Sequence, residues 1–189
     1  PVNNAKKVLI STPYLIPTNG KYAMLETLTA NNADVTVLTN SSASNDSGFI
    51  PAYFEEHRPV LLDMGINLYE YKDGAIHDDH FYHADTYFHN KTFVFDDLYS
   101  YIGSSNFDPR SDFINIEFGM LIQSPEFAQI LETYLLSHKD DLYWHVTKQA
   151  DGSIRWKSGD EEYDASPGYS GWHKFPDWLI RKLNIEYEL

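Results

Sequence analysis

One short stretch of the chain carries side chains that could bind and attack a phosphate diester. His89 and Lys91 are two residues apart, so on a β-strand both side chains project from the same face. The apolar run Phe93-Val94-Phe95 that follows has the aromatic and β-branched content of a buried strand. A second strand, expected over residues 98–102, ends in the loop Gly103-Ser104-Ser105-Asn106.

A hairpin of this length would bring that loop back beside the two basic residues. After a tight polar turn at Asp96, the chain reverses, and Ser104 and Asn106 are expected to face His89 and Lys91. An imidazole, an ammonium, a hydroxyl and an amide would then line one cavity. These are the groups needed to hold the charged oxygens of a phosphate and to attack its phosphorus.

The spacing H-x-K, four residues, Asp96, six residues, G-S-x-N resembles the HKD signature of the phospholipase D superfamily. The resemblance continues through residues 106–111 to Glu117, and this fuller run is similar to the C-terminal half of bacterial cardiolipin synthases, especially the C type. The segments Pro13-Tyr14-Leu15-Ile16-Pro17 and Thr39-Asn40-Ser41 also resemble that family, in which the first borders the active site. The resemblance implies a phosphatidyltransferase that acts on phospholipid phosphodiesters.

The resemblance also implies a role for each residue of the motif. One histidine attacks phosphorus to form a phosphohistidine, while a second protonates the leaving alcohol and deprotonates the incoming one. His89 is then the catalytic imidazole, with Lys91 and Asn106 as the phosphate clamp. Ser104 supplies a hydroxyl at the edge of the clamp, and Glu117 fixes the tautomer of the imidazole. No metal or other cofactor is expected, since these groups already neutralise the phosphate.

The remaining candidates are polar residues in or near the motif. Asp96 belongs to the catalytic motif, although its role in the family is more structural than chemical. The candidate substrate-binding residues are Tyr14, Asn40 and Arg110. For Arg110, an internal ion pair with Asp108 or Asp112 is equally consistent with the sequence. The loops that carry the other two could equally be plain connectors.

The elements that must position these residues alternate between strands and helices. Strands are expected over 6–10, 35–38 and 66–71, separated by helices over 19–31 and 49–64. This β-α-β-α-β order implies a parallel sheet with helices packed on it. Pro59 should kink or split the second helix.

The chain after the motif is expected to continue the same architecture. In order, we expect a long strand over 113–122, a helix that starts at Ser124-Pro125, a hairpin of 143–147 with 154–157, a polar loop over 158–171 and an amphipathic helix over 176–183. The final helix could pack against the sheet or contact a membrane surface.

Together these patterns predict an α/β fold, a phospholipase D-like mixed β-sheet flanked by α-helices, with one HKD half-domain. We expect one domain over residues 1–189, with the hairpin and short helix of about 141–189 as an appendage. The chain starts at Pro1 without a methionine, and we interpret it as part of a longer protein.

Composition narrows the possible partners. Apolar residues make up 42% and charged residues 22%, as in an ordinary globular protein. The net charge of −14 disfavours nucleic acid as a partner unless a basic patch is present locally. Without cysteine, the chain can form neither disulfides nor zinc–thiolate sites. No apolar run approaches the length needed to cross a bilayer.

Three histidines precede the motif at intervals of three residues: His77, His80 and His83. On a helix such spacing could place metal ligands on one face. The segment is polar and lacks a helical apolar stripe, so a solvated loop or a rim that faces the substrate is also consistent with it. We expect these three residues not to bind zinc together.

The chain contains one H-x-K motif, whereas the implied reaction needs two histidines. The partner would be an N-terminal HKD half of the same protein, or a second copy of this chain in a homodimer. The implied location is bacterial, peripheral to the cytoplasmic membrane in the parent protein, with the fragment itself soluble. The alternatives are a single-motif phosphodiesterase or nuclease active as a homodimer, and a catalytically silent fragment.

Overall fold

The computed structural model describes residues 2–79, 88–169 and 178–183. In chain order the helices are η1 (Val2–Asn4), α1 (Asn19–Ala30), α2 (Ile50–Asp63), α3 (Pro109–Phe113), α4 (Pro125–Leu136) and α5 (Lys139–Leu142). The strands are β1 (Lys7–Ser11), β2 (Asp34–Asn40), β3 (Asn67–Tyr71), β4 (Thr92–Phe95), β5 (Tyr99–Gly103), β6 (Gly119–Gln123), β7 (Tyr143–Lys148), β8 (Ile154–Ser158) and β9 (Glu161–Tyr163). The fold is therefore α/β, as predicted.

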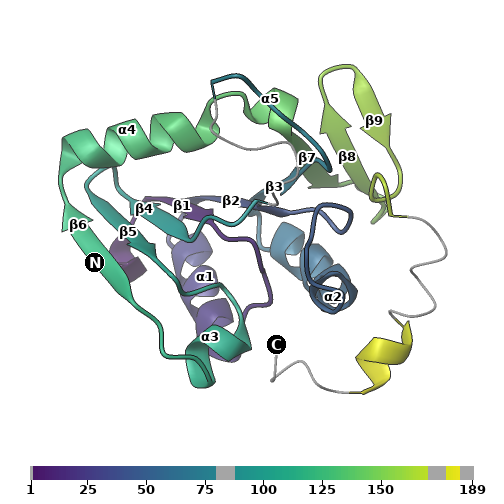
Figure 1. Ribbon diagram of the computed structural model, residues 1–189, viewed down its shortest axis with the longest axis horizontal. Helices are drawn as coiled ribbons and strands as arrows, with labels where there is room; N and C mark the ends of the chain where they lie inside the picture. The colour runs from purple at the N-terminus through teal and green to yellow at the C-terminus, as the bar shows by residue number, and fades with distance from the viewer. Residues whose placement is uncertain (1, 80–87, 170–177, 184–189) are drawn as a thin grey trace.

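The described strands form one mixed sheet in the order β6-β5-β4-β1-β2-β3-β7-β8-β9. The three central strands β1, β2 and β3 are parallel, and the neighbours on both sides join antiparallel. Helices α1 and α2 lie against one face and α4 lies against the other (Figure 1). This is the layered arrangement that the β-α-β-α-β order of the sequence predicted.

The alternation of side chains along β1 separates two cores. Val8 and Ile10 pack into the cluster under α1 and α2, whereas Leu9 packs into the cluster under α4. In β4, Phe95 joins the first cluster and Val94 joins the second. The face of β4 that carries Phe93 and Phe95 is therefore the α1 face.

Three sequence expectations about individual elements were wrong. Helix α2 continues through Pro59 and is not split there, and Arg58, the residue before the proline, is buried in ion pairs with Glu55 and Glu70. The strand expected over 113–122 is shorter, because Phe113 ends the helix α3 and β6 covers only Gly119–Gln123. Part of the expected polar loop forms β9, which pairs with β8.

The end of the chain is described only in part. Residues 178–182 are helical, while the beginning of the helix expected over 176–183 lies outside the described residues. No helix in the described ranges is both long and apolar enough to span a membrane.

Candidate active site

The segment that carries His89 and Lys91 leads directly into β4. The strand begins at Thr92, although the hydrogen bond from Gly103 N to Lys91 O, at 3.1 Å, already joins the segment to the end of β5. Phe88 is buried in the α4-side core, and its carbonyl accepts a hydrogen bond from Asn40 Nδ2 at 2.9 Å. His89 therefore lies between a buried aromatic anchor and a paired strand end.

The surroundings of His89 favour its neutral form. Burial lowers the pKa of His89, and the positive charge of Lys91 lowers it further, while Asp46 acts in the opposite direction. The ring of Tyr14 meets the imidazole edge to face, with 5.8 Å between ring centroids. A neutral imidazole is the form that can attack phosphorus or accept a proton.

Lys91 is half-buried among acidic groups. Burial lowers the pKa of its ammonium, and Asp46, Glu117 and Asp108 act to raise it. Its Nζ atom lies 3.3 Å from the carbonyl oxygen of His89. A fixed ammonium in such a place can hold a charged phosphate oxygen next to the imidazole.

The end of β5 packs tightly against β6. Gly103 and Gly119 are paired across the two strands, and the ring of Tyr101 lies over both. A Cβ atom at Gly119 would lie 2.2 Å from that ring, and one at Gly103 would lie 2.4 Å from its hydroxyl oxygen. Glycine is therefore required at both positions for the motif loop to approach β6 this closely.

The loop after Gly103 is fixed by hydrogen bonds to β6 and the segment before it. Ser104 Oγ donates to the Glu117 carboxylate and accepts a hydrogen bond from Phe118 N at 3.0 Å. The hydrogen bond from Ser104 is the main cause of the lowered pKa of Glu117. Asn115 Nδ2 also donates to Glu117, at 3.0 Å. These contacts fix the loop but leave the predicted contact between Glu117 and the His89 ring untested.

Asn106 is fixed through its backbone. Its N–H donates to Ser111 Oγ at 2.9 Å, and its carbonyl accepts from Lys21 Nζ at 3.1 Å. Its side-chain oxygen is buried, and no hydrogen bond to it is found among the described residues. The structure thus fixes the backbone of Asn106 at the end of the motif loop, and the side chain of Asn106 is hydrogen-bonded to the Asp108 carboxylate.

Two residues that support the site were not among the candidates predicted from the sequence. Lys21, at the start of α1, bonds the motif loop as described and forms an ion pair with Asp112 at 2.8 Å. Asp46 accepts a hydrogen bond from the Tyr14 hydroxyl at 2.7 Å. Both contact residues that are dozens of positions away in the sequence, so local spacing could not have revealed these contacts.

Tyr14 belongs to a loop that is hydrogen-bonded to the residues following the motif. Phe107 N donates to Thr12 Oγ1 at 3.1 Å, and Ile16 N donates to the carbonyl of Phe107 at 2.9 Å. Burial and the hydrogen bond to Asp46 raise the pKa of Tyr14, so its hydroxyl stays protonated. The structure therefore brings Tyr14, predicted to bind substrate, next to His89.

Two predicted site residues have other positions. Asn40 is 1% exposed, and its amide donates to the carbonyls of Pro13 and Phe88. These bonds link the segment of Asn40 to the loop of Tyr14 and to the residue before His89, and the predicted substrate contact of Asn40 stays a prediction. Asp96 lies at the other end of β4, where its Oδ1 accepts from the backbone N–H groups of Lys6 and Lys7.

Arg110 lies on α3 and is exposed. Its Nε donates to Asn115 Oδ1 at 3.3 Å. The two acidic residues considered as its partners have other bonds: Asp108 Oδ1 accepts from Ser111 N at the start of α3, and Asp112 pairs with Lys21. The structure thus places Arg110 near the segment of Glu117 without deciding whether it meets a substrate.

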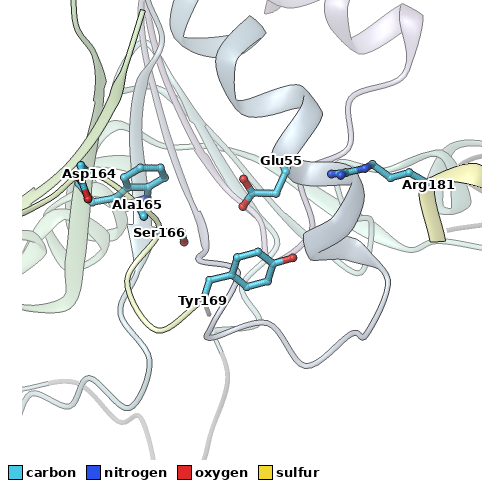
Figure 2. A pocket seen from close by; sticks show the side chains of 7 residues that line it. Glu55, Asp164, Ala165, Ser166, Tyr169 and Arg181 are labelled. Carbon is cyan, nitrogen blue, oxygen red and sulfur yellow. The ribbon is translucent and has the colours of Figure 1, made fainter. Parts of the chain in front are cut away.

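An apolar cavity of about 340 Å³ adjoins the motif loop. Asn106 and Ser105 line its edge, and Phe93, Tyr101 and Phe107 form part of its wall. A second cavity, of about 330 Å³, lies between α2 and the segment after β9 and shares no residue with the motif; Glu55, Ser166, Tyr169 and Arg181 line it (Figure 2). The first cavity is therefore the one next to the proposed chemistry.

The chain is similar to known proteins in its family signature, its sequence and its fold. A family model described as "Cardiolipin synthase, PLD-like domain" matches residues 2–139. Cardiolipin synthase C of Escherichia coli (strain K12) is 32% identical over 195 residues, which cover 98% of this chain and 41% of that protein. The chain thus spans about two fifths of the length of this relative.

Two solved structures share the fold at low sequence identity. Phosphatidylserine synthase from Haemophilus influenzae Rd KW20 has a TM-score of 0.66 and 16% identity, over 97% of this chain and 42% of that one. Nuc, a phospholipase D family member from Salmonella typhimurium, has a TM-score of 0.53 and 16% identity, over 84% of this chain and 86% of that one. At such identities the likeness concerns the fold alone.

Proposed function

The chain belongs to the cardiolipin synthase family of phospholipase D-like domains, and on this premise we propose that it is the C-terminal catalytic half of a phosphatidyltransferase. It acts on phospholipid phosphodiesters at a membrane surface, through a phosphohistidine intermediate. The observation that supports the proposal is the hydrogen bond from Gly103 N to Lys91 O, at 3.1 Å, which joins the segment of His89 and Lys91 to the start of the motif loop. Burial and Lys91 lower the pKa of His89 there.

In this mechanism the phosphatidyl group passes from one alcohol to another in two displacements. An imidazole nitrogen forms a bond to phosphorus as the bond to the first alcohol breaks, and the partner histidine gives that alcohol a proton. The second alcohol then loses its proton to the partner and displaces the imidazole. Lys91 and Asn106 hold the non-bridging oxygens in both steps, and His89 serves as one of the two histidines.

The proposed partner is the complementary phospholipase D-like half. Large apolar side chains are at least half exposed along the segment next to the motif loop: Phe113, Ile114, Ile116, Phe118, Met120 and Leu121. This segment leads into β6, the strand at the edge of the sheet, on the left of Figure 1. A contiguous apolar surface and an open strand edge usually mark a protein interface.

The position of this surface supports a partner that completes the active site. Glu117 lies within the exposed segment and bonds Ser104 of the motif loop. A protein that covers Ile116 and Phe118 would therefore lie against the loop that holds Asn106. Cardiolipin synthase C of Escherichia coli is more than twice as long as this chain. We therefore propose that a complementary half of the same polypeptide covers this apolar surface.

The proposed functional unit includes the sheet beyond the family match. The match ends at residue 139, whereas β7 pairs with β3 through four residues and continues the same sheet into β8 and β9. We therefore propose that residues 1–189 act as one unit, in which the C-terminal hairpin extends the catalytic domain.

A homodimeric phosphodiesterase is the second candidate. The Nuc structure favours it, because this chain covers 86% of that chain and so matches a protein of similar length. The net charge of −14 opposes a nucleic acid substrate. In such a dimer the second histidine would be His89 of another copy, and the same apolar edge would be buried.

The test uses the full-length protein encoded by the gene, with phosphatidylglycerol in mixed micelles. Lys91→Ala and Asn106→Ala should each lower the rate of phosphatidyl transfer by about 10²- to 10³-fold, the usual loss when one group that stabilises charge is removed. Lys157→Ala, which removes an exposed lysine from β8, is the matched control and should leave the rate unchanged. Equal rates in all three variants would refute the assignment of the site.

A further inference from the structure

An apolar cavity of about 340 Å³ lies on the α1 face of the sheet, beside the motif loop. Met24 of α1 lines one side of it, and Phe93, Tyr101 and Leu121 of β4, β5 and β6 line the other. These elements are in the left half of Figure 1, at the end of the sheet that carries β6. The phosphate chemistry proposed above gives this cavity no role.

Aromatic side chains form a fixed wall of the cavity. The rings of Phe93 and Tyr101 are stacked, with 5.3 Å between centroids, and the ring of Phe107 meets that of Phe93 at 88°. Tyr101 also lies over Gly103 and Gly119, where a larger residue would collide with its ring. Rings held in this way are already ordered, so a ligand does not have to order them when it binds.

The charged side chain at the cavity is already paired within the protein. Lys21 lines the cavity, and its Nζ atom forms an ion pair with Asp112 at 2.8 Å and donates to the carbonyls of Asn106 and Asp108. The stem of such a side chain can lie along apolar surface while its ammonium is bonded elsewhere. A water molecule needs about two to four polar partners to stay in a cavity. The lining therefore favours a hydrocarbon group over water or a charged ligand.

The cavity adjoins the groups that are proposed to hold the phosphate. Ser105 and Asn106 of the motif loop line it. The hydrogen bond from Gly103 N to Lys91 O ties the start of that loop to the segment of Lys91. In a phospholipid, only the glycerol carbons separate the phosphate from the ester bonds of the acyl chains. A lipid whose phosphate lies at Lys91 and Asn106 would therefore have the start of its hydrocarbon beside this cavity.

The volume of the cavity matches one hydrocarbon chain. A methylene group takes up roughly the space of a water molecule in the liquid, about 30 Å³, so the cavity holds a chain of about ten carbon atoms. Leu121, which lines the cavity, is 65% exposed, so the cavity is open at the β6 edge. A longer chain can leave the cavity there.

The cavity of similar volume in Figure 2 has a different lining. There Glu55 forms an ion pair with Arg58, and Arg181 forms one with Glu56. A hydrocarbon chain in contact with these charges would remove water from them without replacing its hydrogen bonds. Of these two cavities, the one beside the motif loop is therefore the one that fits an acyl chain.

The histidines that precede the motif belong to neither cavity lining. Of the three, the structure describes His77, whereas His80 and His83 lie outside the described residues. The expectation that these three residues do not bind zinc together is therefore still a prediction.

We propose that the cavity beside the motif loop binds one acyl chain of the phospholipid substrate. This role rests on the proposed phosphatidyl transfer and narrows its substrates. Lipids with a chain of about ten carbons or more should be preferred, because each methylene group that leaves water adds to the affinity. A chain held in the cavity also positions the phosphate, since the two are joined covalently.

The test measures phosphatidyl transfer by the full-length protein from phosphatidylglycerols that carry one acetyl chain and one longer chain. The longer chain varies from about 6 to 14 carbons, and each lipid is used below the concentration at which it aggregates, so that the chain moves from water into the protein. The value of kcat/KM should rise about threefold for each added methylene group until the cavity is full, at about ten carbons, and then stay constant.

Substitutions at Met24 should move the chain length at which the rise stops. Met24→Trp fills the space of about two methylene groups, so the rise should stop about two carbons earlier and kcat/KM for the longest chains should fall about tenfold. Met24→Ala enlarges the cavity, and the rise should continue about two carbons further. Val60→Trp, which places the same indole at an exposed position of α2, is the matched control and should behave like the unaltered protein. Circular dichroism verifies that each variant is folded.

A second measurement separates binding of an acyl chain from binding of the complementary half. In analytical ultracentrifugation, Met24→Trp should associate with that half as the unaltered chain does. The acyl-chain site is overturned if transfer occurs but kcat/KM does not depend on chain length, or if both Met24 variants leave the dependence unchanged. Weaker association of Met24→Trp with an unchanged dependence would show that the complementary half occupies the cavity instead. If no lipid is transferred, diacyl phosphatidylglycerol in mixed micelles included, the proposed function itself fails and the acyl-chain site fails with it.

Discussion

The two ends of the sheet differ in which side chains they bury and which they expose. Around β3, β7 and β8, the ion pair of Arg58 and Glu70 is almost fully buried, and Trp156 Nε1 donates to Glu70 at 3.0 Å. Around β6, Phe118 and Leu121 are 72% and 65% exposed. The end with β3, β7 and β8 thus buries charged side chains that are normally exposed, and the end with β6 exposes large apolar side chains that are normally buried.

The difference indicates which part of the fold is complete. A buried ion pair is tolerated only when its hydrogen bonds are satisfied from all sides, as they are around Glu70. An apolar edge is stable only when something covers it. The predicted site with His89 lies toward the uncovered end, which supports the proposal that a partner completes it.

The largest expected effect is at the uncovered end and concerns activity alone. His89→Ala in the full-length protein should reduce phosphatidyl transfer by about 10⁴-fold or more, as expected when a nucleophile or general acid is lost. The unfolding free energy should change by less than about 1 kcal/mol, because the side chain is partly exposed and packs against little. Turnover assays and chemical denaturation of the same preparation provide both numbers. A variant that retains activity would place the chemistry elsewhere.

At the end of the sheet formed by β3, β7 and β8, the expected effect is on stability alone. Glu70→Gln removes the fully buried one of the two carboxylates that pair with Arg58, leaving only the partly exposed Glu55, and should lower the unfolding free energy by about 3 kcal/mol. The matched control is Glu162→Gln, which breaks the exposed ion pair with Arg155 on the neighbouring strands and should change little. Urea denaturation measures both variants. If Glu70→Gln and Glu162→Gln lower the unfolding free energy by similar, small amounts, the buried ion pair of Arg58 and Glu70 does not stabilise this end of the sheet.

At the apolar edge of β6, a substitution should weaken association with the complementary half and leave stability unchanged. Phe118→Ser should leave the stability of the isolated chain nearly unchanged, because the side chain is already exposed. Its affinity for the complementary half should fall by about 1.5–3 kcal/mol, the value of burying one large apolar side chain. Phe49→Ser, at an exposed apolar residue that precedes α2, is the control and should not affect association. Analytical ultracentrifugation of the mixed halves distinguishes the two variants.

The smallest expected effect is a pair of opposite pKa changes at His89. Asp46 raises the pKa of His89 and Lys91 lowers it, so Asp46→Asn should move this pKa down and Lys91→Met should move it up. If neutral His89 is needed, the acid limb of the pH–rate profile moves to lower pH in the first variant and to higher pH in the second. NMR titration of the imidazole carbon signals measures the shifts. Shifts of the same sign would contradict the described electrostatics.

Sequence reasoning succeeded where the signal is local. The sequence predicted the hairpin of β4 and β5 that follows His89 and Lys91, because a two-strand turn fixes which residues return to each other. The strand starts only at Thr92, so His89 and Lys91 lie just before it. The alternation of strands and helices likewise fixed the parallel centre of the sheet.

The errors and omissions come from contacts between distant segments. The amide of Asn40 bonds the carbonyls of Pro13 and Phe88, contacts that the loop sequence did not reveal. Pro59 was expected to kink or split its helix, yet α2 runs through it without a break. Lys21 and Asp46 lie in ordinary helix and loop sequence, and only the folded chain brings them to the motif.

The most direct test of the central claim is whether the purified chain can catalyse phosphodiester cleavage by itself. Turnover is measured over a concentration series of the isolated chain, alongside its mass in solution, and again after addition of the complementary half. The chain alone should show little or no turnover at any concentration, and activity should be restored by the added half and lost with His89→Ala. Robust turnover that rises with dimer formation of the isolated chain would contradict it and identify a self-sufficient single-motif enzyme.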